Sequence, residues 1–381
     1  MNLKRHLPRL GLALALLSAP FVPAPAWAGI SALTNLFVFG DSLSDGGNSG
    51  ALTGGSFPTS PPYSGNRYSN GPVAVEYLWQ AFNPDNNSFR PSLTAGGTNF
   101  ALGGATTGNE NFVSVWDVTD PFPLIQGAFA QKGNAWQLDA FTTLNPTFNP
   151  YTSLFVVWLF PNDVFYLNNT TPPQGVGSFT GTAGAPILPQ PDVATQLIGT
   201  AVTNISGTIV ELAGKGARNF LVVNSPDLGL IPEFLNAPEE QKGLLSALSG
   251  GFNTVLNQAV SGLATARPDL DITLFEIDKL FAEVRTDKNS FGLDNVIDRC
   301  LVGATICADP DAYLFWDGSH PTTAAHAVIG QRFFQAVYTP VPGPLPAMGV
   351  VVVLGWSRRL RSRMRLMEAG RLQASEPKNQ P

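Results

Sequence analysis

LFVFGDSLSDGGN, residues 36–48, is the stretch of the chain that decides its fold. Its first four residues are apolar and rich in Phe and Val, which predicts a short strand buried on both faces. Gly, Asp, Ser and Asn follow, and these residues favour turns and helix caps. Ser42 is therefore expected at the carboxyl edge of a parallel sheet, where open α/β folds place their ligand sites. A capping serine in an ordinary loop is the alternative.

Four further segments predict strands, and helical patterns separate most of them. The predicted strands cover residues 99–106, 154–160, 219–224 and 271–277. The predicted helices cover residues 71–82, 192–213, 239–266 and 322–337, with glycine breaks near residues 250–251. This alternation predicts a parallel sheet with helices on both sides. The body of about 310 residues has no repeat and no long linker, which favours a single domain, residues 29–340.

The first 28 residues have the features of a secretory signal. Basic residues precede an apolar run at 10–19 that is too short to span a bilayer, and AWA at 26–28 has the pattern of a signal-peptidase site. A first transmembrane anchor is the alternative. The signal predicts that the body is exported, and that it is extracellular or associated with the cell envelope.

Residues 341–381 also predict a sorting function. VPGP at 341–344 precedes an apolar run at 345–356, and five arginines follow between residues 358 and 365. The run is shorter than the roughly 17–25 residues of a standard membrane span. The segment resembles the PEP-CTERM signals of bacterial exported proteins, with Gly343 where these usually carry Glu. The resemblance implies transient membrane contact and processing by an exosortase-type enzyme, with the arginines on the cytoplasmic side. A loose basic tail that touches anionic lipid is the alternative.

Charge and cysteine content narrow the function of the body. The chain has 22 Lys and Arg against 28 Asp and Glu, and ten of the basic but only two of the acidic residues lie in 1–28 and 341–381. The body therefore has a net charge of −14, which argues against a nucleic-acid partner. Cys300 and Cys307 are the only cysteines, and in an exported chain so close a pair predicts a disulfide. A metal site needs more ligands than this pair offers.

Few residues of the body can transfer a proton near neutral pH. His320 lies in a loop three residues after Asp317, so the carboxylate can reach the imidazole Nδ1–H across a turn. A surface histidine is the alternative, and His326 on the following predicted helix is expected to be structural. Gly103 and Gly104, at the end of the predicted second strand, can supply backbone N–H groups to an anion.

Four short blocks, taken in order, resemble the GDSL lipase/esterase family, whose members are also called SGNH hydrolases. The blocks are FGDSLSD at 39–45, NFALGGA at 99–105, PND at 161–163 and DGSHPT at 317–322. Each block is a weak motif, but together they follow the family's order over nearly all of the body. The resemblance implies a flavodoxin-like, three-layer α/β/α sandwich around a five-strand parallel sheet.

The resemblance also implies a role for each matching residue. Ser42 is the expected nucleophile, His320 the general base and acid, and Asp317 the group that orients His320. The backbone N–H groups of Ser42 and Gly104 and the side-chain amide of Asn162 are the expected oxyanion hole, although the other glycine of the pair stays open. No cofactor and no metal are implied.

The third block departs from the family pattern. Phe160 stands where the family usually has Gly, and Pro161 removes one backbone N–H from this corner. Asn162 is retained, but the sequence does not fix the orientation of its side-chain amide or the space left for an acyl chain. Phe160 is expected either to line or to narrow the acyl pocket.

These observations predict an exported serine esterase that acts on small-molecule or lipid carboxylic esters through an acyl-enzyme on Ser42. A polysaccharide O-acetylesterase or an acyltransferase is the alternative within the enzymes. A non-catalytic protein of the cell envelope or matrix is the alternative outside them. The complete set of Ser42, Asp317 and His320 argues against the last.

Overall fold

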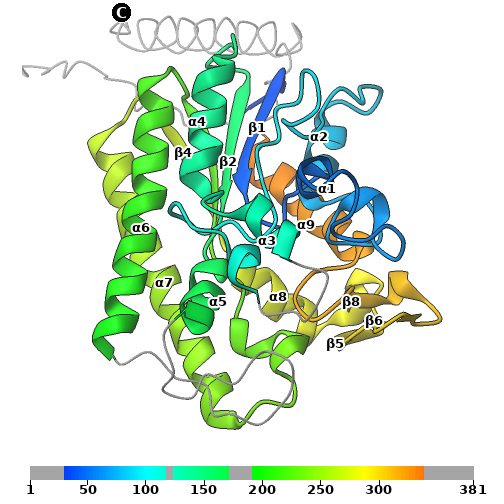
Figure 1. Cartoon of the computed structure of the whole chain (residues 1–381). Coiled ribbons are helices and arrows are strands. Elements are labelled where there is room, and N and C mark those ends of the chain that lie inside the picture. The colour runs from blue at the N-terminus through cyan, green and yellow to red at the C-terminus, as the bar shows by residue number, and fades with distance from the viewer. Residues whose placement is uncertain (1–29, 117–122, 171–190, 339–381) are drawn as a thin grey trace, which may run out of the picture.

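A computed structural model describes residues 30–116, 123–170 and 191–338 (Figure 1). Within these residues the main sheet has four parallel strands in the order β1-β2-β3-β4. They are β1 (Asn35–Gly40), β2 (Ser153–Trp158), β3 (Asn219–Val223) and β4 (Asp271–Phe275). Every residue of β2 and β3 is buried, as expected for parallel strands covered on both faces.

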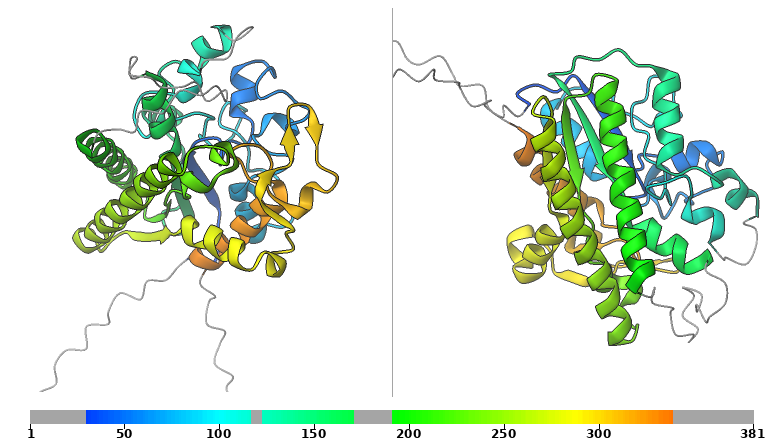
Figure 2. Two further views of the ribbon diagram at one scale, coloured as in Figure 1. Left: turned by 90° about the horizontal axis from the view of Figure 1, so that it is seen from below. Right: turned by 90° about the vertical axis from the view of Figure 1, so that its left-hand side faces the viewer.

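Helices cover both faces of this sheet. They are α1 (Asn48–Leu52), α2 (Ala74–Phe82), α3 (Pro123–Phe129), α4 (Asn134–Leu144), α5 (Pro161–Thr170), α6 (Pro191–Gly214), α7 (Glu239–Ala266), α8 (Ile277–Thr286) and α9 (Thr323–Val337). On one face Phe37 contacts Phe141 of α4, and on the other Trp158 and Phe275 contact Phe333 of α9. Figure 2 shows α6 and α7 on one side of the strands and α8 and α9 on the other. The predicted alternation of strands and helices is confirmed.

The prediction of a fifth strand at residues 99–106 is wrong. Phe100 and Leu102 donate backbone hydrogen bonds to β1 at 2.8 and 3.1 Å, but the ladder is incomplete. The N–H of Gly40 donates to Oε1 of Gln137 at 2.9 Å, and Nε2 of Gln137 donates to the Gly40 carbonyl at 2.7 Å. Because Gln137 takes the Gly40 N–H that a neighbouring strand would use, the ladder stays incomplete, and the segment turns at its glycines directly after Leu102.

Two smaller sheets were not predicted. β5 (Asn295–Arg299) pairs in parallel with β8 (Tyr313–Phe315), and β6 (Leu301–Val302) pairs antiparallel with β7 (Thr305–Ile306). The predicted disulfide between Cys300 and Cys307 is present and closes the β6–β7 hairpin. The strands β6, β7 and β8, of two or three residues each, are too short to give a recognisable period-2 pattern, and β5 is only partly buried and lacks an apolar run.

The long helices α6 and α7 pack against each other. The predicted glycine breaks near residues 250–251 are wrong, because α7 runs through them without interruption. Gly251 instead allows a close approach, since a Cβ there would lie 3.1 Å from Cδ1 of Ile198 on α6. Among the described residues, α6 is the one helix long and apolar enough to cross a membrane. Its residues Ile205, Ile209 and Leu212 are buried in the core, as expected for a helix that covers a sheet.

The two ends of the described body meet at the amino end of the sheet. The N–H of Ile30, just before β1, donates to the Val337 carbonyl at 2.8 Å, and Ile30 also pairs with Tyr338. The loops that follow the carboxyl ends of β1 and β2 lie at the other end of the strands (Figure 1). The predicted signal, residues 1–28, and the predicted sorting tail, residues 341–381, lie outside the described residues.

Candidate active site

Ser42 lies in a tight turn directly after β1, as predicted. The carbonyl of Asp41 accepts hydrogen bonds from the N–H groups of Ser44 and Asp45 at 3.1 and 3.0 Å, which closes the turn. Gly40 leaves little room for a side chain, because a Cβ there would lie 3.2 Å from a carbonyl oxygen of β2. Ser42 is thereby held at the carboxyl edge of the sheet, where it lines a cavity.

The carboxylate of Asp45 joins this turn to the glycine turn at residues 103–104. It is fully buried and accepts hydrogen bonds from the N–H groups of Gly47, Asn48 and Gly103 at 2.8, 2.6 and 3.0 Å. Burial raises the pKa of Asp45, and these bonds oppose the shift. Asp45 was part of the quoted motif, but sequence reasoning gave it no role.

The loop that carries Asp317 and His320 connects β8 to α9. Oδ1 of Asp317 accepts hydrogen bonds from the backbone N–H groups of Ser319 and His320, both at 2.9 Å. The N–H of Trp316 donates to the His320 carbonyl at 2.7 Å. Thr322 then caps α9, since its hydroxyl accepts the N–H three residues on at 3.2 Å. The backbone of the loop thus fixes both side chains.

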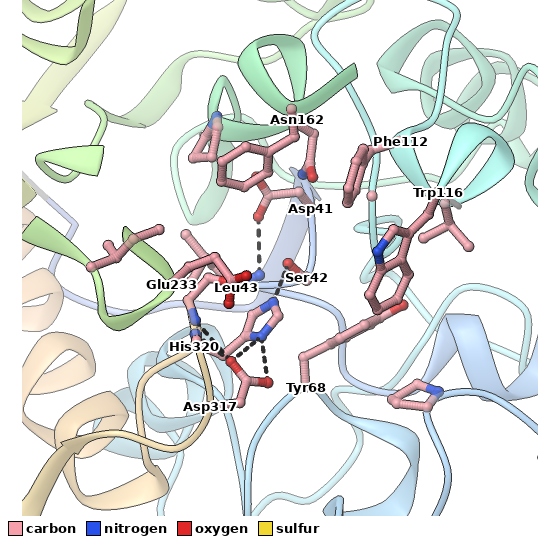
Figure 3. A pocket seen from close by; sticks show the side chains of 18 of the residues that line it. Asp41, Ser42, Leu43, Tyr68, Phe112, Trp116, Asn162, Glu233, Asp317 and His320 are labelled. Atoms are coloured by element: carbon pink, nitrogen blue, oxygen red, sulfur yellow. Dashed lines mark hydrogen bonds and ion pairs between the residues drawn. The ribbon is translucent and has the colours of Figure 1, made fainter. Parts of the chain in front are cut away.

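A chain of hydrogen bonds joins Ser42, His320 and Asp317 (Figure 3). Nε2 of His320 lies 2.8 Å from Oγ of Ser42, and Nδ1 lies 2.8 Å from each carboxylate oxygen of Asp317. The fold therefore brings together three residues that sequence reasoning selected from opposite ends of the chain. A serine hydroxyl bound to an imidazole, which a carboxylate holds on its other side, is an arrangement that can activate the hydroxyl as a nucleophile.

Tyr63 is a further member of this network. Its hydroxyl donates to Oδ2 of Asp317 at 2.8 Å, and its ring packs edge-on against Trp316 with centroids 6.4 Å apart. Sequence reasoning gave Tyr63 no individual role. Nothing in the sequence indicated which aromatic residue would reach the carboxylate.

The pKa of His320 is raised and that of Asp317 is lowered, each mainly by the presence of the other. Burial by itself lowers the pKa of His320, but the charge and hydrogen bond of Asp317 outweigh it and raise the pKa above its usual value. Burial by itself raises the pKa of Asp317, but the nearby His320 and the backbone hydrogen bonds lower it overall. Asp317 is therefore ionised near neutral pH, where it can stabilise a protonated His320.

The two adjacent glycines differ in what their N–H groups do. The N–H of Gly103 donates to the Asp45 carboxylate, whereas the N–H of Gly104 finds no acceptor among the described residues. Gly104 has φ 76°, a backbone conformation that favours glycine. The N–H of Ser42 and the side-chain amide of Asn162 are likewise unpaired within the described part of the chain. Gly104, Ser42 and Asn162 line the same cavity.

The expectation that Phe160 lines or narrows the acyl pocket is wrong. Its ring is fully buried and stacks on Phe252 with centroids 3.8 Å apart, outside the cavity wall. Its φ of 141° lies in a region that glycine adopts readily, which gives a reason for glycine at this position. Pro161 is the first residue of α5, where a backbone N–H has no partner within the helix anyway. Asn162 follows at the cavity wall.

The serine, the histidine and the unpaired donors share one cavity of about 490 Å³. This volume lies within the usual range for small-molecule sites. Much of the lining is apolar and includes Phe57, Phe112, Trp116, Phe165, Leu228 and Ile231. An apolar cavity with a few polar groups around one hydroxyl suits a substrate that has an apolar portion and a single reacting group.

Two buried carboxyl groups near the site are not part of the serine–histidine–aspartate chain. Oδ1 of Asp41 accepts the N–H of Leu43 at 3.0 Å, while its buried Oδ2 has no partner among the described residues. Burial raises the pKa of Asp41 to about 7. Asp163 binds the N–H and hydroxyl of Thr107 at 2.9 and 2.6 Å, and burial raises its pKa to about 6. Both carboxyl groups therefore titrate closer to neutral pH than exposed ones.

His326 stands apart from the reacting groups. It is buried on α9, and its Nδ1 accepts the N–H of Ala74 at 3.2 Å. Burial and the nearby His320 lower its pKa to about 3, so it is neutral at pH 7 and serves as a core acceptor, as expected. Across the described ranges, no group of three or more His, Cys, Asp or Glu side chains is arranged to hold a metal ion.

Comparison with known proteins gives the family. The model of the GDSL-like lipase/acylhydrolase family matches residues 36–333, which include the turn after β1 and the loop before α9. The chain therefore belongs to the GDSL-like lipase/acylhydrolase family. The fold and the site described above agree with this membership, and the enzyme class is that of serine ester hydrolases.

Three relatives show the range of activities near this chain. A phosphatidylcholine-sterol acyltransferase of Aeromonas hydrophila is 26% identical, over 81% of this chain and 92% of its own. A GDSL esterase/lipase of Arabidopsis thaliana is 25% identical, over 79% of this chain and 86% of its own. Acetylajmalan esterase 2 of Rauvolfia serpentina is 26% identical, over 78% of this chain and 88% of its own.

Proposed function

We propose that Ser42 is the nucleophile of a carboxylic-ester hydrolase that works through an acyl-enzyme. His320 takes the proton of the Ser42 hydroxyl as Oγ attacks the ester carbonyl, and it then returns that proton to the leaving alcohol oxygen. Asp317 keeps the Nδ1–H tautomer of His320 and stabilises its charged form. Water attacks the acyl-enzyme in the same way and frees Ser42. The observation that carries the proposal is the 2.8 Å contact between His320 Nε2 and Ser42 Oγ, with Asp317 behind it.

We place the oxyanion of the tetrahedral intermediate between the N–H groups of Ser42 and Gly104 and the amide of Asn162. All three donors lack partners among the described residues and line the same cavity as the hydroxyl. Each donor in such a site contributes roughly 3–4 kcal/mol to lowering the barrier. Gly104 takes precedence over Gly103, because Gly103 already donates to Asp45.

Hydrolysis of esters with an apolar acyl group is the favoured reaction. The aromatic lining supports a substrate larger than an acetyl ester, so a polysaccharide O-acetylesterase fits the cavity less well. Acyl transfer to an acceptor other than water is the second candidate, because a relative of similar length carries the name of an acyltransferase.

The test compares Ser42→Ala with Ser44→Ala, a matched control from the same turn. The Ser44 hydroxyl is buried and has no partner among the described residues, so its removal leaves the site intact. Residues 29–340 should hydrolyse p-nitrophenyl acyl esters, and only Ser42→Ala should lose the activity. A folded Ser42→Ala protein that hydrolyses like the wild type refutes the mechanism. A chain-length series run beside an acetylated glycan separates esterase or lipase from deacetylase, and an added alcohol acceptor detects acyl transfer.

We further propose that the body is exported and then sorted through its C-terminal segment. The basic and apolar segments at 1–28 and the Pro, apolar and Arg segments at 341–381 support this proposal. The Cys300–Cys307 disulfide also supports it, because disulfides persist mainly in oxidising compartments.

A further inference from the structure

The two sides of the cavity differ in chemistry. Phe112 and Trp116 lie on one side of Ser42, and Glu233 lies on the other (Figure 3). Phe112 and Trp116 stack on each other with centroids 5.9 Å apart. On the other side, Arg299 lines the cavity with Glu233, and the two side chains form an ion pair at 3.5 Å. The cavity is thus aromatic on one side and charged on the other.

The proton transfer decides which part of the ester meets each side. The alcohol oxygen must lie beside Nε2 of His320 to receive the proton as its bond to the acyl carbon breaks. Glu233 belongs to the same corner, because its N–H donates to the Gly318 carbonyl at 2.8 Å, within the loop between Asp317 and His320. The alcohol part therefore leaves toward Glu233, and the acyl chain extends the other way, toward Phe112 and Trp116.

The ion pair has unused hydrogen-bonding capacity. Nη2 of Arg299 donates to the Pro232 carbonyl at 3.2 Å and Nη1 faces Glu233, but Nε has no acceptor among the described residues. The second carboxylate oxygen of Glu233 is also unpaired within the described residues. The Glu233 and Arg299 side chains are 28% and 37% exposed, so they are open to the cavity without being free in solvent. Together they offer donors and acceptors side by side with no net charge.

We propose that Glu233 and Arg299 form the alcohol subsite and select esters of polyhydroxylated alcohols, such as glycerol or a sugar. Neighbouring hydroxyl groups both donate and accept hydrogen bonds, which matches a carboxylate beside a guanidinium. A single charge on the alcohol would be attracted by one partner and repelled by the other. The substrate is then an apolar acyl chain on a neutral polyol. This inference rests on the proposed function of the same site.

The experiment uses two esters with one acyl chain, 1-octanoylglycerol and methyl octanoate. Arg299→Met should lower kcat/KM for the glycerol ester about tenfold and for the methyl ester less than about twofold, because only the first loses hydrogen bonds. Arg299→Lys, which keeps the charge but has fewer donors, should give an intermediate ratio. It also keeps the test available if Arg299→Met folds poorly.

Arg332→Met is the matched control, because Arg332 forms an ion pair with Glu283 at 2.9 Å, is 38% exposed and does not line the cavity. Arg332→Met should leave kcat/KM unchanged for both esters. Equal losses on both esters with Arg299→Met, or no loss on the glycerol ester, overturn the alcohol subsite. Ser42→Ala must abolish both reactions, and its failure to do so would refute the proposed mechanism whatever the ratio.

Discussion

Asp317 accepts hydrogen bonds from two backbone N–H groups, from the ring of His320 and from the hydroxyl of Tyr63. These donors keep the carboxylate ionised and fix its plane, so the imidazole is held with Nε2 toward Ser42. In the proposed mechanism Tyr63 is a positioning residue, because its hydroxyl contacts Asp317 and not Ser42 or His320 Nε2. Burial and the neighbouring Asp317 raise the pKa of the Tyr63 hydroxyl, so it stays a donor at all working pH values.

Tyr63→Phe should lower kcat about tenfold and leave KM nearly unchanged. A hydrogen bond to a charged group contributes about 1.5–3 kcal/mol, and the phenylalanine ring keeps the contact with Trp316. Without this donor the Asp317 charge acts more strongly on His320, so the acidic limb of the kcat/KM profile should move to higher pH. Tyr77→Phe is the control, since it loses a similar hydroxyl contact, with Thr323, away from the site. An unchanged rate and pH profile in folded Tyr63→Phe would show that Tyr63 only packs.

The pH dependence of the wild type follows from the raised pKa of His320. The base must be neutral to accept the Ser42 proton, so kcat/KM should fall as the pH drops through a value above 6.5, the ordinary histidine pKa. Asp317→Asn should lower kcat about 10³–10⁴-fold and shift the remaining limb to lower pH, because the charge that raises the histidine pKa is gone. A titrimetric assay from about pH 5 to 9 measures both. A wild-type limb well below 6.5 would contradict this assignment.

Sequence reasoning was effective for residues whose type is rare. The body has only two histidines, so His320 and its partner Asp317 could be selected without a structure. It failed for common residues that act through tertiary contacts, such as Tyr63 and Asp45. It could not choose between Gly103 and Gly104 either, because that choice depends on which N–H already donates to Asp45.

Among the elements, strands with long apolar runs were predicted well, and strands that depend on short pairings were predicted poorly. The strands β1, β2 and β3 are almost entirely buried and have long apolar runs, whereas β4 at the edge of the sheet is only half-buried. The segment at 99–106 has a similar composition but forms only part of a ladder with β1, because the side chain of Gln137, which lies in a helix, accepts the N–H of Gly40. No local sequence pattern shows this, because whether a segment forms a strand depends on which distant groups hydrogen-bond to the neighbouring backbone.

The junction between β2 and α5 gives a stability test. At φ 141°, glycine should be better tolerated than alanine, so Phe160→Gly should be more stable than Phe160→Ala by about 1 kcal/mol or more. Both should be several kcal/mol less stable than the wild type, since each loses the stack on Phe252. Urea unfolding measures the difference. Ala259→Gly in the interior of α7 is the control. There glycine should be less stable than alanine by about 1 kcal/mol, the reverse of the order at position 160. A Phe160→Ala protein more stable than Phe160→Gly would contradict the backbone argument.

On the scale of the whole molecule, the two ends of the described body, Ile30 and Tyr338, lie at the opposite end of the sheet from the cavity. Ile30 and Tyr338 pair at the amino end of the strands, and Ser42 follows the carboxyl end of β1. Under the proposal of a C-terminal sorting segment, this placement lets the segment contact a membrane while the mouth of the cavity stays accessible. Substrate can then reach Ser42 both before and after processing.

The sorting proposal predicts where the mature chain ends. Mass spectrometry of the secreted protein should find no peptide beyond about residue 345, because the apolar run and the arginine cluster would be removed. The N-terminal peptide of the same sample should begin near residue 29. Intact residues 358–381 recovered from the medium would contradict sorting, without bearing on the catalytic site.

The most direct test of the account is to identify the residue that a fluorophosphonate ester modifies. Such reagents react with an activated serine, so peptide mapping of the labelled protein should place one adduct on Ser42. Labelling should stop when His320 is replaced by alanine, since the 2.8 Å contact that activates Oγ is lost. An adduct on a different serine, or active enzyme that carries no adduct on Ser42, would contradict the central claim.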